Sequence, residues 1–112
     1  MIDSYEFGRI VIDGKTYDHD VIILSDKIKD NWWRKEGHKL YLADIEPIFR
    51  DAPQTVIIGT GASGMMKVEE EVRKGLSSKN IEIIIAETKK ACETYNKVCK
   101  TRKTAATLHL TC

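Results

Sequence analysis

An alternation of short apolar runs and amphipathic stretches in the second half of the chain most constrains its fold. Apolar runs occupy residues 55–58, 81–86 and 105–110, and the stretches between them carry apolar residues at helical spacing. The pattern predicts strand, helix, strand, helix, strand. Two crossovers of this length favour a mainly parallel sheet that is covered by helices and has right-handed connections.

The two amphipathic stretches define the predicted helices. In the first, the apolar residues at helical spacing are Met65, Val68, Val72 and Leu76. The spacing predicts a helix that begins just after Gly64. Thr88 is a suitable N-cap for the second helix, whose inner face would carry Ala91, Cys92, Tyr95, Val98 and Cys99.

The first half of the chain predicts a β-hairpin followed by less regular structure. Tyr5–Ile12 and Lys15–Leu24 have the composition of strands, and Asp13-Gly14 between them is a typical tight turn. The polar residues 25–42 are expected to hold one more short strand. Asp44 is a plausible N-cap for a brief helix that runs through Phe49.

Length and charge bound the class of protein. The 112 residues are enough for one domain and not for two. A net charge of +1 argues against a nucleic-acid partner, and without an apolar stretch near 18 residues no membrane span is expected. Three cysteines without paired spacing are typical of a reducing compartment. A cytoplasmic location is therefore expected.

A glycine-rich segment, residues 59–64, follows the first of these strands. Gly59, Gly61 and Gly64 match the G-x-G-x-x-G pattern, whose backbone N–H groups bind phosphate at a helix start. Glu87 stands where a ribose-binding acid would be expected. The alternative, which base rates favour, is that the glycines only turn the chain and that Glu87 only favours the start of the next helix. No cofactor is assigned.

Trp32, Trp33 and Arg34 form the second candidate site. On an extended segment neighbouring side chains point to opposite faces, so one indole would enter the core and the other would be an exposed anchor for a protein partner. The alternative, slightly favoured, is that a three-layer fold buries both indoles.

The end of the last strand is polar, with His109, Thr111 and Cys112. A Cys/His pair would need an activated thiolate, and the terminal position of Cys112 argues against one; its role is left open. Spacing of the histidines His19, His38 and His109 matches no known metal motif, and no metal is expected.

Four motifs in order resemble the Mth938-like domain family over essentially the whole chain. They are Trp33-Arg34-x-x-Gly37-His38, then Thr55-Val56-Ile57-Ile58-Gly59-Thr60-Gly61, then Thr88-x-x-Ala91-x-x-x-Tyr95-Asn96, and finally His109-Leu110-Thr111-Cys112. The length is similar to that of the archaeal type member. The resemblance implies an α/β single domain of three layers, residues 1–112, with a central mixed, mainly parallel sheet, flanking helices and the N-terminal hairpin.

Members of this family include a mitochondrial complex I assembly factor and a vertebrate adipogenesis-associated protein, and the resemblance implies no enzyme activity. We therefore expect a binding or assembly module with a protein partner, whose interface candidates are Trp32, Trp33 and Arg34. The rival hypothesis is a protein or enzyme that binds a small anion or a nucleotide. Its candidate residues are Gly59, Gly61, Ser63, Gly64, Glu87, Asn96 and His109.

Overall fold

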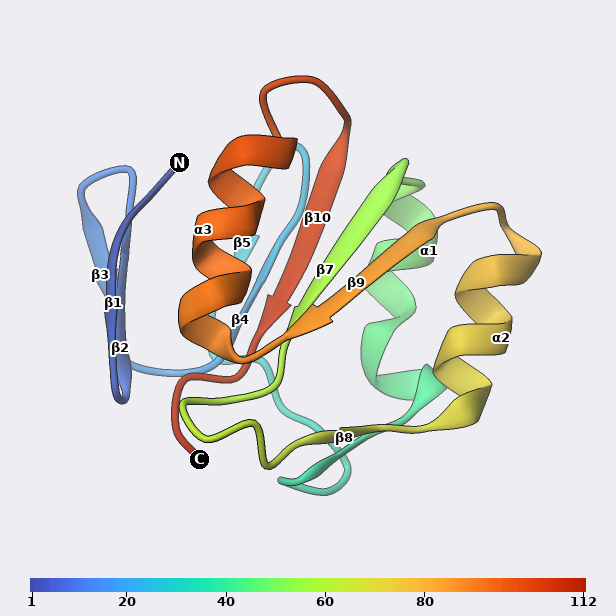
Figure 1. Ribbon diagram of the computed structural model, residues 1–112, viewed down its shortest axis with the longest axis horizontal. Coiled ribbons are helices and arrows are strands. Elements are labelled where there is room, and N and C mark those ends of the chain that lie inside the picture. Colours follow the sequence, from blue (N-terminus) through green and yellow to red (C-terminus); the bar gives the residue numbers. More distant parts are fainter.

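A central sheet of five strands organises the computed structural model, which describes residues 1–112 (Figure 1). Its strand order is β5-β4-β10-β7-β9. The bounds are β4 Val21–Ile23, β5 Ile28–Lys29, β7 Thr55–Gly59, β9 Glu82–Ala86 and β10 Thr104–Leu108. The β10, β7 and β9 strands run parallel, and only β4 runs against its two neighbours. The predicted mixed, mainly parallel sheet is confirmed.

A second, three-stranded antiparallel sheet is formed by β1 (Ile2–Glu6), β2 (Arg9–Ile12) and β3 (Lys15–Tyr17). The predicted turn at Asp13-Gly14 is confirmed, with positive φ at both residues as a tight hairpin turn requires. The prediction of two long strands is otherwise wrong, because each of them is divided into two shorter strands. Its first strand breaks at Gly8, where φ is +76°, and its second strand breaks after Tyr17, so that β4 joins the other sheet.

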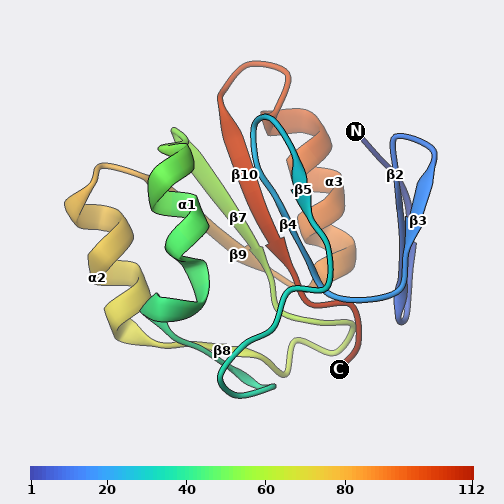
Figure 2. The ribbon, with the colours of Figure 1, turned by 180° about the vertical axis from the view of Figure 1, so that it is seen from behind.

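Three layers result from the handedness of the two crossovers. The chain passes from β7 through α2 (Glu70–Ser78) to β9, and then back through α3 (Thr88–Val98) to β10 on the far side of β7. Because right-handed connections in opposite directions lie on opposite faces, α3 and α2 cover different sides of the sheet. The N-terminal sheet lies on the same side as α3, and α1 (Glu46–Asp51) lies with α2 (Figures 1 and 2).

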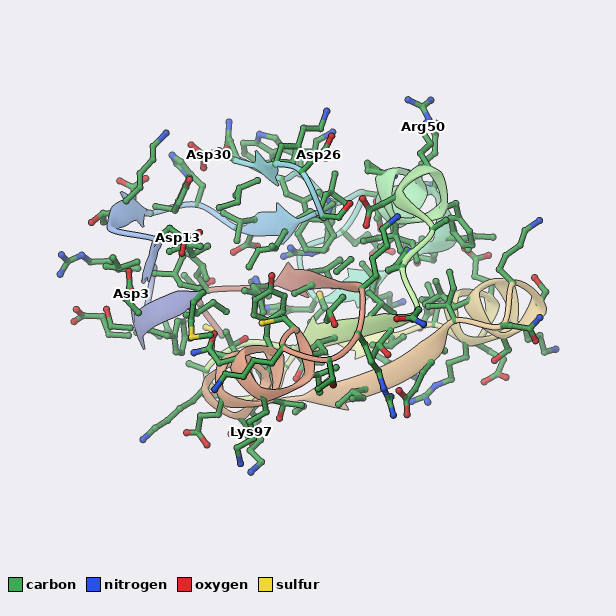
Figure 3. The ribbon with its side chains drawn as sticks, turned by 90° about the horizontal axis from the view of Figure 1, so that it is seen from above. Asp3, Asp13, Asp26, Asp30, Arg50 and Lys97 are labelled. Carbon is green, nitrogen blue, oxygen red and sulfur yellow. The ribbon has the colours of Figure 1, made fainter.

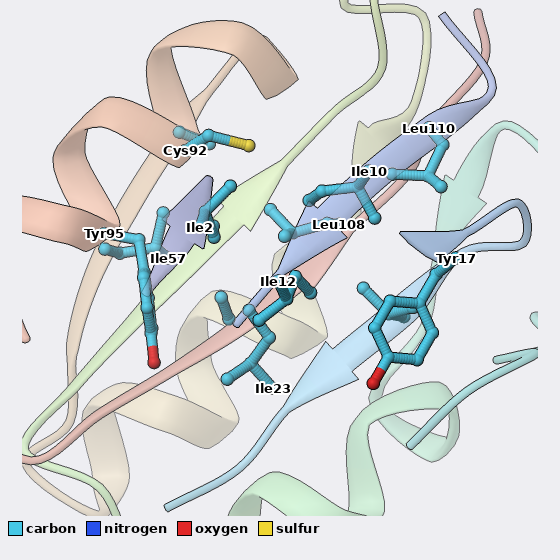
Figure 4. Packing of buried hydrophobic residues seen from close by; sticks show 13 residues of the cluster. Ile2, Ile10, Ile12, Tyr17, Ile23, Ile57, Cys92, Tyr95, Leu108 and Leu110 are labelled. Carbon is cyan, nitrogen blue, oxygen red and sulfur yellow. The ribbon is translucent and has the colours of Figure 1, made fainter. Parts of the chain in front are cut away.

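Two hydrophobic cores fill the spaces between the layers. Alternation along β7 sends Ile57 to the core under α3, and Val56 and Ile58 to the core under α1 and α2. Figure 4 shows the first core, where isoleucines of the N-terminal sheet meet Cys92 and Tyr95 of α3. Charged side chains lie outside these cores, as the labelled Arg50 and Lys97 do in Figure 3.

The helix that was predicted to start just after Gly64 is displaced. Residues 60–66 form a loop, and Lys67–Val68 forms the short strand β8, which pairs in parallel with β6 (Lys39–Leu40). The α2 helix then begins at Glu70. Val72 and Leu76 are buried in it as expected, whereas Met65 is exposed in the loop.

The remaining helix starts also shift by a few residues. Asp44 lies in a 3-10 turn, η1 (Leu42–Ile45), where its carboxylate accepts a hydrogen bond from the Tyr41 amide, and α1 follows at Glu46. Thr88 is the first residue of α3 rather than its N-cap, which is Glu87. None of the helices is both long enough and apolar enough to cross a lipid bilayer.

Candidate functional site

The carboxyl ends of β7, β9 and β10 meet at one edge of the central sheet, which is where ligands bind in many open α/β sheets. Because β4 runs in the opposite direction, its start lies at this same edge. Asp20, one residue before β4, thereby comes next to His109, one residue after β10. The edge brings together side chains from segments that are far apart in the sequence.

Asp20, Arg34 and His109 form a closely bonded cluster at this edge. Asp20 Oδ2 accepts hydrogen bonds from Arg34 Nη1 at 2.6 Å and from His109 Nδ1 at 2.8 Å. Its Oδ1 accepts the Leu110 amide at 2.7 Å. Arg34 Nη2 donates to the Gly37 carbonyl oxygen. The side chains of Arg34 and His109 are only 5% and 6% exposed, so this is a buried ion pair with a histidine attached.

Hydrogen bonding determines the charge state of the cluster. Burial by itself would raise the pKa of the Asp20 carboxyl group. Hydrogen bonds from His109, the Leu110 amide and Arg34 outweigh burial, and they hold this pKa below its ordinary value. His109 Nδ1 lies between the Asp20 carboxylate at 2.8 Å and Arg34 Nη2 at 3.0 Å, so its tautomer decides whether it donates to the first or accepts from the second. His109 Nε2 is buried and has no hydrogen-bond partner.

A cavity of about 350 Å³ opens beside this cluster. Its walls come from the segment before β4, from residues 31–37 and from the end of the chain. The polar cluster contributes Asp20, Arg34 and His109, and Asp18 and Trp33 stand at the exposed rim. The volume is at the lower end of the range for ligand pockets. It suits a small molecule or a single side chain of a partner.

The two tryptophans at the cavity have opposite environments. Trp32 is buried, its indole N–H donates to the Asp44 carbonyl oxygen at 2.9 Å, and the Arg34 guanidinium lies 4.9 Å from its ring centre. Trp33 is 78% exposed. The prediction that one indole enters the core and the other faces outward is confirmed. The favoured alternative, that both are buried, is wrong, because residues 31–34 form a surface loop with no layer outside it.

The glycine loop at the same edge is filled by the protein itself. The Gly61 amide donates to Thr88 Oγ1, and the amides of Ala62 and Met65 donate to the carbonyl oxygens of Thr111 and Cys112. A Cβ on Gly61 would lie 2.4 Å from the Cys112 carbonyl carbon. Gly61 therefore allows a close approach, as predicted. The group that approaches is the backbone of Thr111 and Cys112, which follow β10, and not a ligand.

Gly59 and Gly64 also have packing roles. A Cβ on Gly59 would lie 2.9 Å from Leu108 Cδ2, and one on Gly64 would lie 3.2 Å from Glu87 Cγ. The Gly64 amide donates to the Gly61 carbonyl oxygen. No helix begins at this loop, so the helix dipole that was expected to favour an anion is missing. Anion binding here stays a prediction, and most of the amides that motivated it are bonded within the chain.

The other predicted ligand residues are only partly brought together. Ser63 and Glu87 are exposed at this edge, and Glu87 lies beside Gly64. Asn96 lies two turns further along α3, where its amide group binds both the N–H and the C=O of Ile2 and ties the N-terminal sheet to the helix. Asn96 is therefore not part of the edge.

The cysteines do not join the cluster. Burial, with a contribution from Glu93, raises the pKa of the Cys92 thiol to about 12, which makes it unreactive. Cys112 is exposed and all three cysteines are free. No group of three or more His, Cys, Asp and Glu side chains is arranged to hold a metal ion.

Asp20 is the residue that the sequence analysis missed. Its partners are 14 and 89 residues away, so no local spacing relates them. The one available signal is its place directly before the apolar run Val21–Leu24, since an acid that caps a buried strand needs a partner.

Comparison with known proteins gives one family and several related structures. The profile of a family described as "Protein of unknown function (DUF498/DUF598)" matches residues 2–109. A conserved hypothetical protein from Pyrococcus horikoshii is similar with 27% identity and a TM-score of 0.85, over 100% of this chain and 99% of that one.

Two bacterial structures extend the comparison. A Bartonella henselae protein, described as an outer membrane protein, has 25% identity and a TM-score of 0.84, over 98% of this chain and 93% of that one. A Mth938-like domain from Bordetella pertussis has 16% identity and a TM-score of 0.71, over 98% and 85%, and shows the shared fold. The resemblance to Mth938-like domains is confirmed.

Proposed function

The chain belongs to the DUF498/DUF598 family of Mth938-like proteins, whose function is unknown, and we propose that it is a binding or assembly module for another protein. The observation that carries the proposal is the position of Trp33. A large aromatic side chain that is 78% exposed buries little of its surface in this domain. Tryptophan is enriched among the few residues that carry most of the binding energy at protein interfaces.

The loop that carries Trp33 is fixed by contacts of the residues on either side of Trp33. On one side Trp32 is buried and bonded to Asp44, and on the other Arg34 is paired with Asp20. A backbone that is already fixed loses little conformational freedom when a partner binds, and this favours affinity. Trp32 and Arg34 therefore position Trp33, and Trp33 is the residue that would touch the partner.

Two further exposed apolar side chains flank the same edge. The amide of Gly8, the residue after Phe7, donates to the Leu110 carbonyl oxygen. The Met65 amide donates to the Cys112 carbonyl oxygen. Thr111, between these two acceptors, lines the cavity together with Trp33. We define the contact surface as Phe7, Trp33 and Met65. Aromatic residues and methionine are enriched at protein interfaces, which supports this assignment.

The test is affinity capture from cells of the source organism, with the wild-type protein, Trp33→Ala and Lys97→Ala as baits. Lys97 is exposed in the last turn of α3, remote from the contact surface, and serves as the control. We expect one protein to be retained by the wild type and by Lys97→Ala, and to be reduced about 30-fold or more by Trp33→Ala, as for an interface hot spot.

The free energy of unfolding of Trp33→Ala should remain within about 0.5 kcal/mol of the wild type, since the side chain is at the surface. Equal capture by all three baits would refute the proposal.

The proposal keeps the expected cytoplasmic location, which cell fractionation tests. The rival, an anionic ligand at the glycine loop, predicts that nucleotides or phosphate raise the melting temperature.

A further inference from the structure

We propose that the cavity beside Trp33 receives a lysine or arginine side chain of the protein partner. This inference rests on the proposed function, because it assigns the chemistry of the group that the contact surface recognises. Three observations carry it: the indole face that no cation of the chain covers, the charge of the cavity wall, and the rigidity of its floor.

The first observation is the difference between the two adjacent indoles. The face of Trp32 is covered by the Arg34 guanidinium at 4.9 Å, and tyrosines 17 and 41 are each covered by a lysine ammonium. No cation of the chain lies over Trp33, although tryptophan is the best aromatic acceptor for one. The exposed indole therefore has a free face that can accept a cation, at the rim of a cavity.

The second observation is the charge that remains on the cavity wall. The charged residues that line it are Asp18, Asp20 and Arg34, so the formal charge is −2 + 1 = −1 with the histidines neutral. Asp20 and Arg34 neutralise each other at 2.6 Å. The carboxylate of Asp18 is 80% exposed, and the ring of His19 lies 3.4 Å from it. The free charge at the rim is therefore negative.

An anionic guest is disfavoured for the same reason. The one cation in the wall, Arg34, is 5% exposed and already donates to Asp20 and to the Gly37 carbonyl oxygen. An incoming carboxylate would meet Asp18, and the one donor of Arg34 without a partner, its Nε–H, is buried out of reach. A guest ammonium or guanidinium group would instead gain both the Asp18 carboxylate and the Trp33 ring.

The third observation is that the floor of the cavity is fixed before the guest arrives. Both oxygens of the Asp20 carboxylate are hydrogen bonded, and the buried side chain of His109 lies against it. The volume of about 350 Å³ has room for one long side chain and not for a folded segment. The cavity would therefore take a single cationic side chain, with Phe7 and Met65 contacting the residues around it.

The experiment is an NMR titration at pH about 8, where histidine is neutral, that follows the indole N–H signal of Trp33. The probes are three capped tripeptides, acetyl-Gly-X-Gly-amide, with X as lysine, norleucine or glutamate. Norleucine keeps the alkyl chain without the charge. We expect a dissociation constant of about 1 mM for the lysine peptide, and binding of the norleucine peptide that is weaker by about five-fold or more.

Variants locate the effect. Asp18→Asn should weaken the lysine peptide by about two- to five-fold, whereas Asp26→Asn, at an exposed aspartate beyond the other end of β4, should change nothing. Butylammonium, which has the cationic head without a backbone, should bind no more tightly than the peptide. Tighter binding of butylammonium would overturn the assignment to a protein side chain.

The two proposals fail in different ways. Equal affinity for the lysine and norleucine peptides, or a preference for glutamate, would overturn the cation site, while the loss of partner capture in Trp33→Ala would still stand. Conversely, capture that is indifferent to Trp33 would refute the proposed function even if the lysine peptide binds. The captured protein itself gives a further check, because replacing its contacting lysine or arginine by methionine should weaken the complex by about five-fold or more.

Discussion

The glycine loop 59–64 and the cavity beside Trp33 lie at the same edge of the sheet, but the loop is closed by the chain itself and the cavity is open. The loop resembles a ligand site in the sequence, yet its amides are bonded to Thr88 and to the carbonyl oxygens of residues 111 and 112. The cavity matches no ligand-binding pattern in the sequence, yet it is open and has an uncovered indole at its rim. A motif supplies donors, but the rest of the chain decides whether they stay free.

The difference has a physical origin. Backbone N–H groups are obligatory donors, so a loop that is packed inside a protein finds acceptors within the chain whenever another segment can reach it. The ring of an exposed tryptophan has no such requirement, since water contact costs it only the hydrophobic term. An uncovered aromatic side chain is therefore a better sign of a binding surface here than a glycine pattern.

The largest expected effect is the loss of the floor of the cavity. Asp20→Ala removes the partner of Arg34, which is 5% exposed, and should lower the free energy of unfolding by about 3–5 kcal/mol. Urea denaturation measures the change. Asp18→Ala, at the exposed rim, serves as the control and should stay within about 0.5 kcal/mol. A loss below about 1 kcal/mol for Asp20→Ala would mean that water replaces the carboxylate.

A smaller effect is expected where the closed loop is forced open. Gly61→Ala places a methyl group 2.4 Å from the Cys112 carbonyl carbon, at a φ of +110° that other residues rarely adopt. We expect a loss of about 2 kcal/mol or more. Gly37→Ala, where a Cβ meets nothing within 4 Å, is the matched control and should be nearly neutral. Equal melting temperatures for the two variants would show that the loop is not tightly closed.

The smallest effect is the loss of stability in acid that comes from Asp20. The folded-state pKa of Asp20 is lowered, so its contribution to stability is complete above the unfolded value of about 3.9 and is lost as the pH falls through the folded value. Wild-type stability should therefore fall more steeply in acid than that of Asp20→Asn. Parallel curves of unfolding free energy against pH would contradict the assignment.

The C-terminal half of the fold could be predicted from the sequence because its signals are local. Val56 to Ile58 and Ile83 to Ile85 form apolar runs that are typical of strands in a helix-covered sheet, and Ala91 and Tyr95 repeat with the period of a helix. The start of α2 could not be predicted. Val68 fits the helical spacing, but pairing of β8 with β6, about 28 residues earlier, places it in a strand.

The candidate site was predictable only in part. The pair Trp32 and Trp33 is conspicuous, and its in-and-out arrangement follows from the alternation of an extended chain. The Asp20–Arg34–His109 cluster was not predictable. It requires β4 to lie next to β10 and antiparallel to it, and this pairing joins residues whose separation of about 89 positions leaves no periodic trace.

The position of β10 has a consequence for synthesis on the ribosome. Among the five strands of the central sheet β10 is the last in sequence, yet it lies between β4 and β7 and is the link between the two halves of the sheet. A nascent chain can pair β4 with β5 and β7 with β9, but these halves stay unconnected until residues 104–108 emerge. The central sheet therefore cannot fold as one cooperative unit before residues 104–108 are available, and until then each of its halves has an open edge.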